Sequence, residues 1–333
     1  MTRAYLHGIF VATSVTLQFL FACPPVAAQQ SGGAVAAFPE FKAHLVDRLP
    51  GGYKVAVVDI DRDGKPDVIG LATTPSTLAW YKNPNWERHT LTSQAKEYID
   101  LAPRDIDGDG RIDLAIAHEF GMSRTSSGGV VSWLRCPEDP TQEWPMYAIG
   151  AEPTSHRIRW ADIDGDGRKE LIDAPIMGRD AKGPLWDVGA RLIAYAVPDS
   201  PATEPWKSIV IDDQLTVIHG IAVVDWNGDG RDDILTASFE GVHLHRLSRE
   251  GNRMGDQKTR LASGEQADPT KRGSSEIVVG RVGRKMGHFL AAIEPWHGDK
   301  VVVYTPGPDS HVPWQRTVID ATFNEGHALI WHV

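Results

Sequence analysis

The sequence predicts an all-β fold, a β-propeller built from four-stranded blades. A unit of apolar strand, acidic glycine-rich loop and second apolar strand occurs four times along the chain. The first aspartates of the four loops, Asp59, Asp105, Asp162 and Asp225, are separated by 46, 57 and 63 residues. That spacing suits four short strands joined by loops of variable length, and convincing amphipathic helices are absent from the pattern.

Each copy of the unit can be divided into four strands. In the first copy, one strand (55–58) enters the acidic loop and a second (67–71) leaves it. In the fourth copy the same pair is 220–224 and 233–237. Third strands are expected at 77–81, 130–134, 192–197 and 242–247. Fourth strands open with an aromatic residue, at Trp86, Trp144 and Trp206. The strands beside the loop are near-continuous apolar runs, so we expect both of their faces to be buried.

A fifth copy has strands at 276–280, 289–293 and 301–304 and a fourth that starts at Trp314. Its turn, 281–287, carries no carboxylate, so no metal is expected there. A sixth copy starts at His327, and the sequence stops before its loop. We therefore expect about five complete blades and a partial sixth, with an open propeller edge that a partner would cover.

The four loops present oxygen ligands in the order that Ca2+ prefers. Side-chain oxygens alternate at loop positions 1, 3 and 5, Gly at position 6 allows a sharp turn, position 7 offers a backbone carbonyl, and position 9 returns a carboxylate. The predicted ligands are Asp59, Asp61, Asp63, Lys65 and Asp67; Asp105, Asp107, Asp109, Arg111 and Asp113; Asp162, Asp164, Asp166, Arg168 and Glu170; and Asp225, Asn227, Asp229, Arg231 and Asp233. Four bound Ca2+ ions would offset much of the net charge of −10.

The N-terminus predicts export, with a signal peptide at 1–28, a linker at 29–37 and the calcium-binding propeller at 38–333. Arg3 precedes an apolar stretch, and small residues before Gln29 suit cleavage. We expect a periplasmic or extracellular protein without a membrane span; a lipid anchor at Cys23 and an uncleaved anchor are the alternatives. Cys23 and Cys136 are the two cysteines, so cleavage leaves no internal disulfide. No basic tract suggests nucleic acid.

The register of the copies places several histidines at equivalent positions. Six residues before the first loop position, or its equivalent, the copies carry Tyr53, Ile99, His156, His219, Ser274 and His327. Equivalent positions in a propeller lie on a ring around its axis, so His156, His219 and His327 are expected to converge. The alternative is that each histidine bonds neighbouring backbone at a crowded strand start.

Carboxylates and further histidines follow the leaving strands, on the side away from the calcium loops. Glu240, Glu294 and His297 join the ring histidines as candidate catalytic residues. The candidate substrate-binding residues are Arg157, Arg159, Trp296, His118 and Glu119. The glutamates could instead pair with arginines, and Trp296 could fill a blade interface. The histidines could hold Zn2+ with an open coordination position, or one could remove a proton next to a carbonyl.

The acidic loops between strands resemble FG-GAP or VCBS repeats of β-propellers over roughly residues 40–320. A narrower resemblance is carried by stretches such as Ala292-Ile-Glu-Pro-Trp-His-Gly298 and by 155–162, 218–225, 236–243 and 325–329. These look like the propeller domain of aldos-2-ulose dehydratase-type proteins. In that family the propeller has seven blades and cupin domains follow it, so the resemblance implies a chain that is cut short here.

Two functions from different classes remain open. The resemblance implies an exported lyase that removes water from a 2-keto sugar of the aldos-2-ulose or anhydrofructose type. The other function is a non-catalytic FG-GAP or VCBS interaction module that binds carbohydrate or protein. In both, the expected ligand is a small sugar, a polysaccharide or a protein surface rather than nucleic acid.

Overall fold

The computed structural model describes residues 42–250, 253–281, 287–307 and 314–322. The predicted signal peptide (1–28), the linker (29–37) and His327 lie outside these ranges. The chain divides into two compact units, Met1–His44 and Leu45–Val333. The described residues of the first unit, 42–44, form no regular secondary structure. Everything below concerns the second unit.

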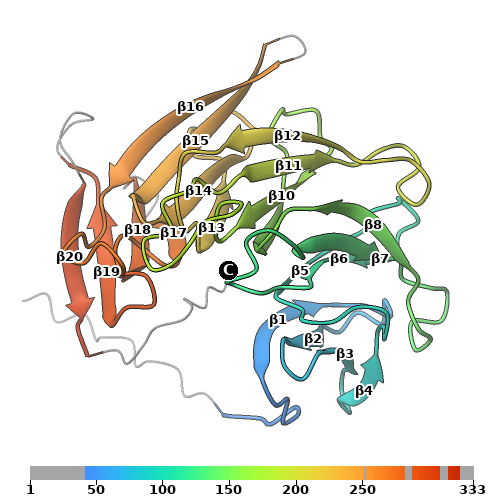
Figure 1. Ribbon diagram of the computed structural model, residues 1–333. Helices are drawn as coiled ribbons and strands as arrows, with labels where there is room; N and C mark the ends of the chain where they lie inside the picture. Colours follow the sequence, from blue (N-terminus) through green and yellow to red (C-terminus); the bar gives the residue numbers. More distant parts are fainter. Residues whose placement is uncertain (1–41, 251–252, 282–286, 308–313, 323–333) are drawn as a thin grey trace, which may run out of the picture. The chain divides into compact units, whose positions relative to one another are not determined.

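The described part of the second unit contains 20 strands, in five four-stranded antiparallel sheets (Figure 1). The first sheet contains β1 (Gly52–Val58), β2 (Asp67–Ala72), β3 (Thr77–Lys82) and β4 (Glu87–Thr90). The second contains β5 (Asp100–Arg104), β6 (Asp113–His118), β7 (Val130–Leu134) and β8 (Met146–Ala151). The third contains β9 (Ser155–Ala161), β10 (Glu170–Pro175), β11 (Leu192–Ala196) and β12 (Lys207–Asp212). The fourth contains β13 (Gly220–Val224), β14 (Asp233–Ser238), β15 (Gly241–Glu250) and β16 (Arg253–Ala262). The fifth contains β17 (Ile277–Arg281), β18 (His288–Glu294), β19 (Lys300–Thr305) and β20 (Gln315–Asp320).

The five sheets are the blades of a β-propeller. Within each sheet the strands are ordered as in the chain. The first strands of successive sheets contact one another, β1 with β5, β5 with β9, β9 with β13, and β13 with β17. The first strand of each blade is therefore the inner one, as Figure 1 shows. The predicted all-β propeller of four-stranded blades is confirmed.

The hydrophobic core is divided among the interfaces between successive blades. Adjacent residues of one strand pack into different interfaces, because side chains alternate across a sheet. Leu171 of β10 packs against the second blade, and Ile172 packs against the fourth. The tryptophans that open the fourth strands are expected in the core: Trp144 and Trp206 are 0% and 7% exposed, whereas Trp86 and Trp314 are only partly buried.

Two parts of the structure differ from the simplest expectation. The sequence at 41–46 resembles the fourth strand of a blade with no blade before it, but residues 42–46 are not in a strand, and residue 41 is outside the described ranges. Val55 and Val57 in β1 are 63% and 56% exposed, whereas Leu101 in the neighbouring β5 is 3% exposed. The described residues therefore leave one face of the first inner strand uncovered.

No stretch of the described chain forms a helix of the length and apolarity that a membrane crossing requires.

The interface between the fourth and fifth blades can be tested by a matched pair of leucine truncations. Leu235 is completely buried in that interface, whereas Leu45 is 71% exposed. We expect Leu235→Ala to lower the free energy of unfolding by about 2–5 kcal/mol, because it leaves a cavity. Leu45→Ala should change it by less than about 0.5 kcal/mol. Urea unfolding followed by tryptophan fluorescence measures both, and equal losses would contradict the blade packing.

Candidate functional site

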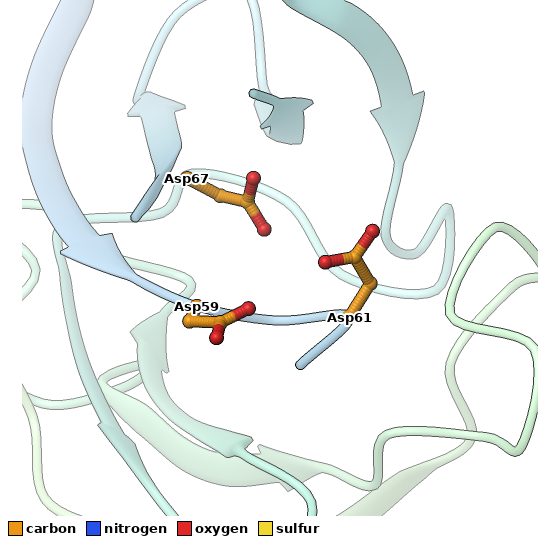
Figure 2. A group of neighbouring side chains, drawn as sticks. All are labelled: Asp59, Asp61 and Asp67. Carbon is orange, nitrogen blue, oxygen red and sulfur yellow. The ribbon is translucent and has the colours of Figure 1, made fainter. Parts of the chain in front are cut away.

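Three of the four acidic loops bring their carboxylates together at the ends of the inner strands. In each, the groups at positions 1, 3 and 9 place one oxygen apiece within 4.8 Å of the others: Asp59, Asp61 and Asp67; Asp105, Asp107 and Asp113; Asp162, Asp164 and Glu170. Figure 2 shows the first set facing a common space. In the fourth loop position 3 is Asn227, whose amide donates to Asp229 at 3.1 Å.

The loop backbone is folded around the first aspartate. Asp105 accepts hydrogen bonds from Gly108 N at 2.8 Å and Gly110 N at 3.0 Å. Both glycines have positive φ, 77° and 83°, which explains why glycine occupies these positions. Asp113 returns to the start of the loop, where it accepts from Ile106 N at 2.9 Å. These bonds hold the carboxylates in place without using all of their oxygen lone pairs.

The first loop keeps carboxylates in excess after their paired lysines are counted. Asp61 pairs with Lys82 at 2.6 Å and Asp63 pairs with Lys65 at 3.0 Å. Loop 1 has four carboxylates at its ligand positions, so these two cations leave a net charge of −2. Burial raises the pKa of Asp113 to about 6 and that of Glu170 to about 7. Their charged forms are therefore destabilised unless a cation is close.

At the opposite ends of the inner strands, three predicted histidines lie together. The rings of His156 and His219 have centroids 4.8 Å apart, and so do the rings of His219 and His297. His219 Nε2 and His297 Nε2 are separated by 2.9 Å. The three side chains come from the third, fourth and fifth blades, as the register predicted for His156 and His219. We call this group, with Tyr53, the histidine cluster.

Local packing explains how His219 reaches the fifth blade. A side chain on Gly220 would lie 2.8 Å from the carbonyl oxygen of Ser275, so only glycine permits this approach of the two chains. His219 Nδ1 then lies 3.2 Å from that oxygen and 3.6 Å from Glu276 Oε1. On the other side, Tyr53 Oη lies 3.1 Å from His156 Nε2.

A buried ion pair supports the histidine cluster. Arg157, whose side chain is 5% exposed, donates to Glu276 Oε1 at 2.9 Å and lies 3.0 Å from His156 Nε2. Although burial opposes it, the neighbouring Glu276 carboxylate raises the pKa of Arg157. Burial raises the pKa of the Tyr53 phenol. The cluster thus combines imidazoles with one fixed cation and one fixed anion.

Four of the predicted site residues have hydrogen-bond partners within the blades. Glu294 is fully buried and accepts from Arg316 at 2.9 Å, from Ser274 at 3.3 Å and from Tyr304. Glu240 accepts from Thr216 N at 2.9 Å and from Ser238 at 3.0 Å. His118 is in β6, a strand that is buried on both faces, and its Nε2 lies 3.0 Å from Ser132 Oγ. Glu119 directly follows this strand with φ 52°, and its carbonyl accepts from Arg124 at 2.8 Å.

Two other predicted residues lie near the histidine cluster but have different partners. Trp296 packs on His297, with ring centroids 4.8 Å apart, and on Phe239, at 5.6 Å. It therefore fills the interface between the fourth and fifth blades. Arg159 pairs with the buried Asp100 at 2.7 Å. His327 lies outside the described residues.

Sequence reasoning missed Glu276, which contacts both Arg157 and His219. The sequence feature that could have identified Glu276 is a single carboxylate at the start of an otherwise apolar inner strand. A cavity of ≈460 Å³ adjoins His297 and is lined by polar residues that include Asp268, Lys271 and Lys300. The cavity reaches His297, whereas His156 and His219 behind it are buried, and its volume is within the range of small-molecule sites.

The fold and the acidic loops define a repeat-built propeller, and comparison with known families agrees. A model of the FG-GAP-like repeat matches residues 59–116. A model described as the aldos-2-ulose dehydratase β-propeller domain matches residues 128–306, more than half of the chain. The chain therefore belongs to the aldos-2-ulose dehydratase β-propeller family.

One similar characterised protein is aldos-2-ulose dehydratase of Phanerodontia chrysosporium, with 29% identity over 318 residues. The match covers 86% of this chain and 34% of that protein, so the chain spans about a third of its relative.

Solved structures with a similar arrangement include an Agrocybe aegerita lectin that recognises non-reducing terminal N-acetylglucosamine. It shares 12% identity over 82% of this chain and 67% of its own, with a TM-score of 0.48. The V. cholerae biofilm matrix protein Bap1 shares 15% identity over 82% of this chain and 38% of its own, with a TM-score of 0.39.

The structural role of Glu294 can be tested by removing its cation. We expect Arg316→Met to lower the free energy of unfolding by about 2–4 kcal/mol, because it leaves a buried carboxylate without its charged partner. Arg88→Met removes the exposed partner of Asp47 and should cost less than about 1 kcal/mol. The double variant Arg316→Met/Glu294→Gln should recover part of the loss. Equal losses for the two single variants in urea unfolding would contradict this role.

Proposed function

We propose that this protein is an exported, calcium-binding β-propeller that acts on carbohydrate as a lyase, removing water from a 2-keto sugar. The observation that carries the proposal is the convergence of His156, His219 and His297 from three blades beside a polar cavity. Membership of the aldos-2-ulose dehydratase propeller family supports the substrate class. Export rests on the signal-like pattern at 1–28.

The histidine cluster contains the groups that such an elimination requires. A β-elimination next to a carbonyl needs a base for the proton on the adjacent carbon and an acid for the departing hydroxyl. Imidazole suits both tasks, since its ordinary pKa lies near neutrality. His297 is only partly buried and lines the cavity, so it is the histidine placed to meet the substrate first. Arg157, fixed by Glu276, holds a positive charge beside the cluster.

The close pair of histidines would supply two of the three protein ligands that a catalytic Zn2+ ion takes. Two tetrahedral zinc ligands with bonds of 2.0–2.1 Å would be about 3.3 Å apart. His219 Nε2 and His297 Nε2, at 2.9 Å, are near that separation. His156 instead directs Nε2 toward Tyr53 and Arg157. Bound between His219 and His297, zinc would supply a Lewis acid for the keto oxygen.

A non-catalytic interaction module is the second candidate. The exposed valines of β1 favour it, because an uncovered apolar strand face is a surface that a binding partner can bury. In this case Glu240 and Glu294 would serve packing through their hydrogen bonds within the blades, and the histidines would bond neighbouring backbone.

Calcium binding can be measured as a stabilisation. Each occupied loop should add about 1.4 kcal/mol to the free energy of unfolding when Ca2+ is at ten times its dissociation constant. EDTA should lower Tm and Ca2+ should restore it, with Mg2+ at equal concentration less effective. Asp164→Asn should weaken this response, whereas Asp187→Asn, at an exposed position outside the loops, should not. A Tm that is indifferent to EDTA and Ca2+ would exclude calcium as a structural ion.

Lyase activity can be followed by enone absorbance with 1,5-anhydrofructose or glucosone as substrate. We expect His219→Gln and His297→Gln to lower kcat by about 10²–10⁴-fold, the usual contribution of a general acid or base. The matched control is His243→Gln, since His243 is buried like His219, at 7% exposure, but lies on β15, the third strand of its blade, outside the histidine cluster. Its activity should stay within about threefold of the wild type.

Two outcomes would contradict the proposal. Absorbance that develops equally in wild type and His297→Gln would place the chemistry elsewhere. No absorbance with any variant would remove lyase activity on these two sugars and leave the interaction module.

A further inference from the structure

A second and larger cavity runs along the inner strands, away from the approach to His297. Its volume is ≈800 Å³, and the described residues that line it come from four inner strands or the residues beside them. They include Lys54 of β1, Arg159 of β9, residues 221–224 of β13 and residues 276–281 of the fifth blade. We call it the axial cavity. Its size is typical of a site for a small organic ligand rather than for an ion.

Among the described residues, the charged lining of the axial cavity is mainly cationic, although the whole chain has a net charge of −10. Lys54, Arg159 and Arg281 line it, and among the described lining residues Glu276 is the carboxylate. Glu276 is already paired with Arg157 at 2.9 Å. A cavity with charge of one sign and low-dielectric walls concentrates ligands of the opposite sign.

Lys54 and Arg159 are held side by side by one buried carboxylate. Asp100 is completely buried; its Oδ1 lies 3.4 Å from Lys54 Nζ and its Oδ2 lies 2.7 Å from Arg159 Nη1. Although burial alone would raise it, Arg159 and Lys54 lower the pKa of Asp100 to about 2. The single Asp100 carboxylate thus holds both cations in place, and the three side chains together carry a net charge of +1.

Lys54 and Arg159 both have exposed side-chain surface and hydrogen-bond donors that a ligand could use. Their side chains are 30% and 29% exposed. Within the described part of the chain, the hydrogen bonds of Arg159 to Asp100 and to Ile158 O both use Nη1. Nε and Nη2 remain, and a guanidinium edge of this kind suits a planar carboxylate. The Asp100 carboxylate acts to raise the pKa of Lys54, but burial and the nearby arginines have the larger combined effect, and the pKa of Lys54 is lowered. An anion that enters the cavity would therefore stabilise the charged ammonium group.

We propose that the axial cavity binds an organic carboxylate, with Arg159 and Lys54 as the pair that recognises its anionic group. The remaining walls include apolar side chains of Ile277, Val279 and Phe289, which suit the carbon skeleton of the ligand. A sugar acid combines both features: a carboxylate and a compact ring with apolar faces. Lys54 and Arg159 are not members of the histidine cluster, and Glu276 is the residue that lines the axial cavity and also contacts that cluster.

The test is calorimetric titration of the full chain with D-glucuronate and with D-glucose, which differ by the carboxylate. We expect glucuronate to bind at least tenfold more tightly than glucose. Lys54→Gln should raise the Kd for glucuronate about tenfold. The variant leaves Arg159 in place to neutralise the buried Asp100. Lys207→Gln, the same change at an exposed position of β12, should leave the Kd within twofold.

Other results would overturn the proposal. Equal affinity for glucuronate and glucose, no binding of either, or an equal effect of the two lysine substitutions would exclude a carboxylate site at Lys54. Inorganic phosphate that binds as tightly as glucuronate would show a site for small anions rather than for an organic carboxylate. His297→Gln should leave glucuronate binding unchanged even if it abolishes lyase activity, so the two proposals can fail separately.

Discussion

The face-to-face packing of successive blades is the constraint on which the rest of the structure depends. Each middle strand sends alternate side chains into two interfaces, as Leu171 and Ile172 do in β10. A slip of one residue would exchange these two faces and bury the wrong side chains, so the register of every blade is fixed. Because the registers are fixed, residues at equivalent positions meet near the axis. His156 and His219 are in contact for this reason, although 63 residues separate them in the sequence.

Most of the fold could be predicted because its signals are local. The apolar runs place β13 at 220–224 and β3 at 77–81, and the structure has Gly220–Val224 and Thr77–Lys82. Register also brought His156 and His219 together. The partners of the glutamates could not be predicted. Glu294 contacts Tyr304 on β19 and Arg316 on β20, and the repeat pattern does not determine which residues of these strands face it. The position of His297 depends on a turn with φ 48°, which residue spacing does not reveal.

The two ends of the inner strands β9 and β13 carry different chemistry. An acidic loop follows each strand, while a histidine lies at or just before its start, so His219 and Asp225 are about 20 Å apart along an extended chain. This exceeds the screening length of about 8 Å at physiological ionic strength. A cation in the loops would therefore act on the histidine cluster through the rigidity of the blade rather than through its field. Stability and ligand chemistry can then vary independently at opposite ends of the same strand.

Glu276 connects the histidine cluster with the axial cavity. It lines the cavity, pairs with Arg157 at 2.9 Å and lies 3.6 Å from His219 Nδ1. Residues in one buried network show effects that do not add, so a substitution at Glu276 would disturb both sites and assign a role to neither. Lys54 and His297 are at the two ends of this network, each in contact with one cavity. They are the positions at which carboxylate recognition and imidazole chemistry can be separated.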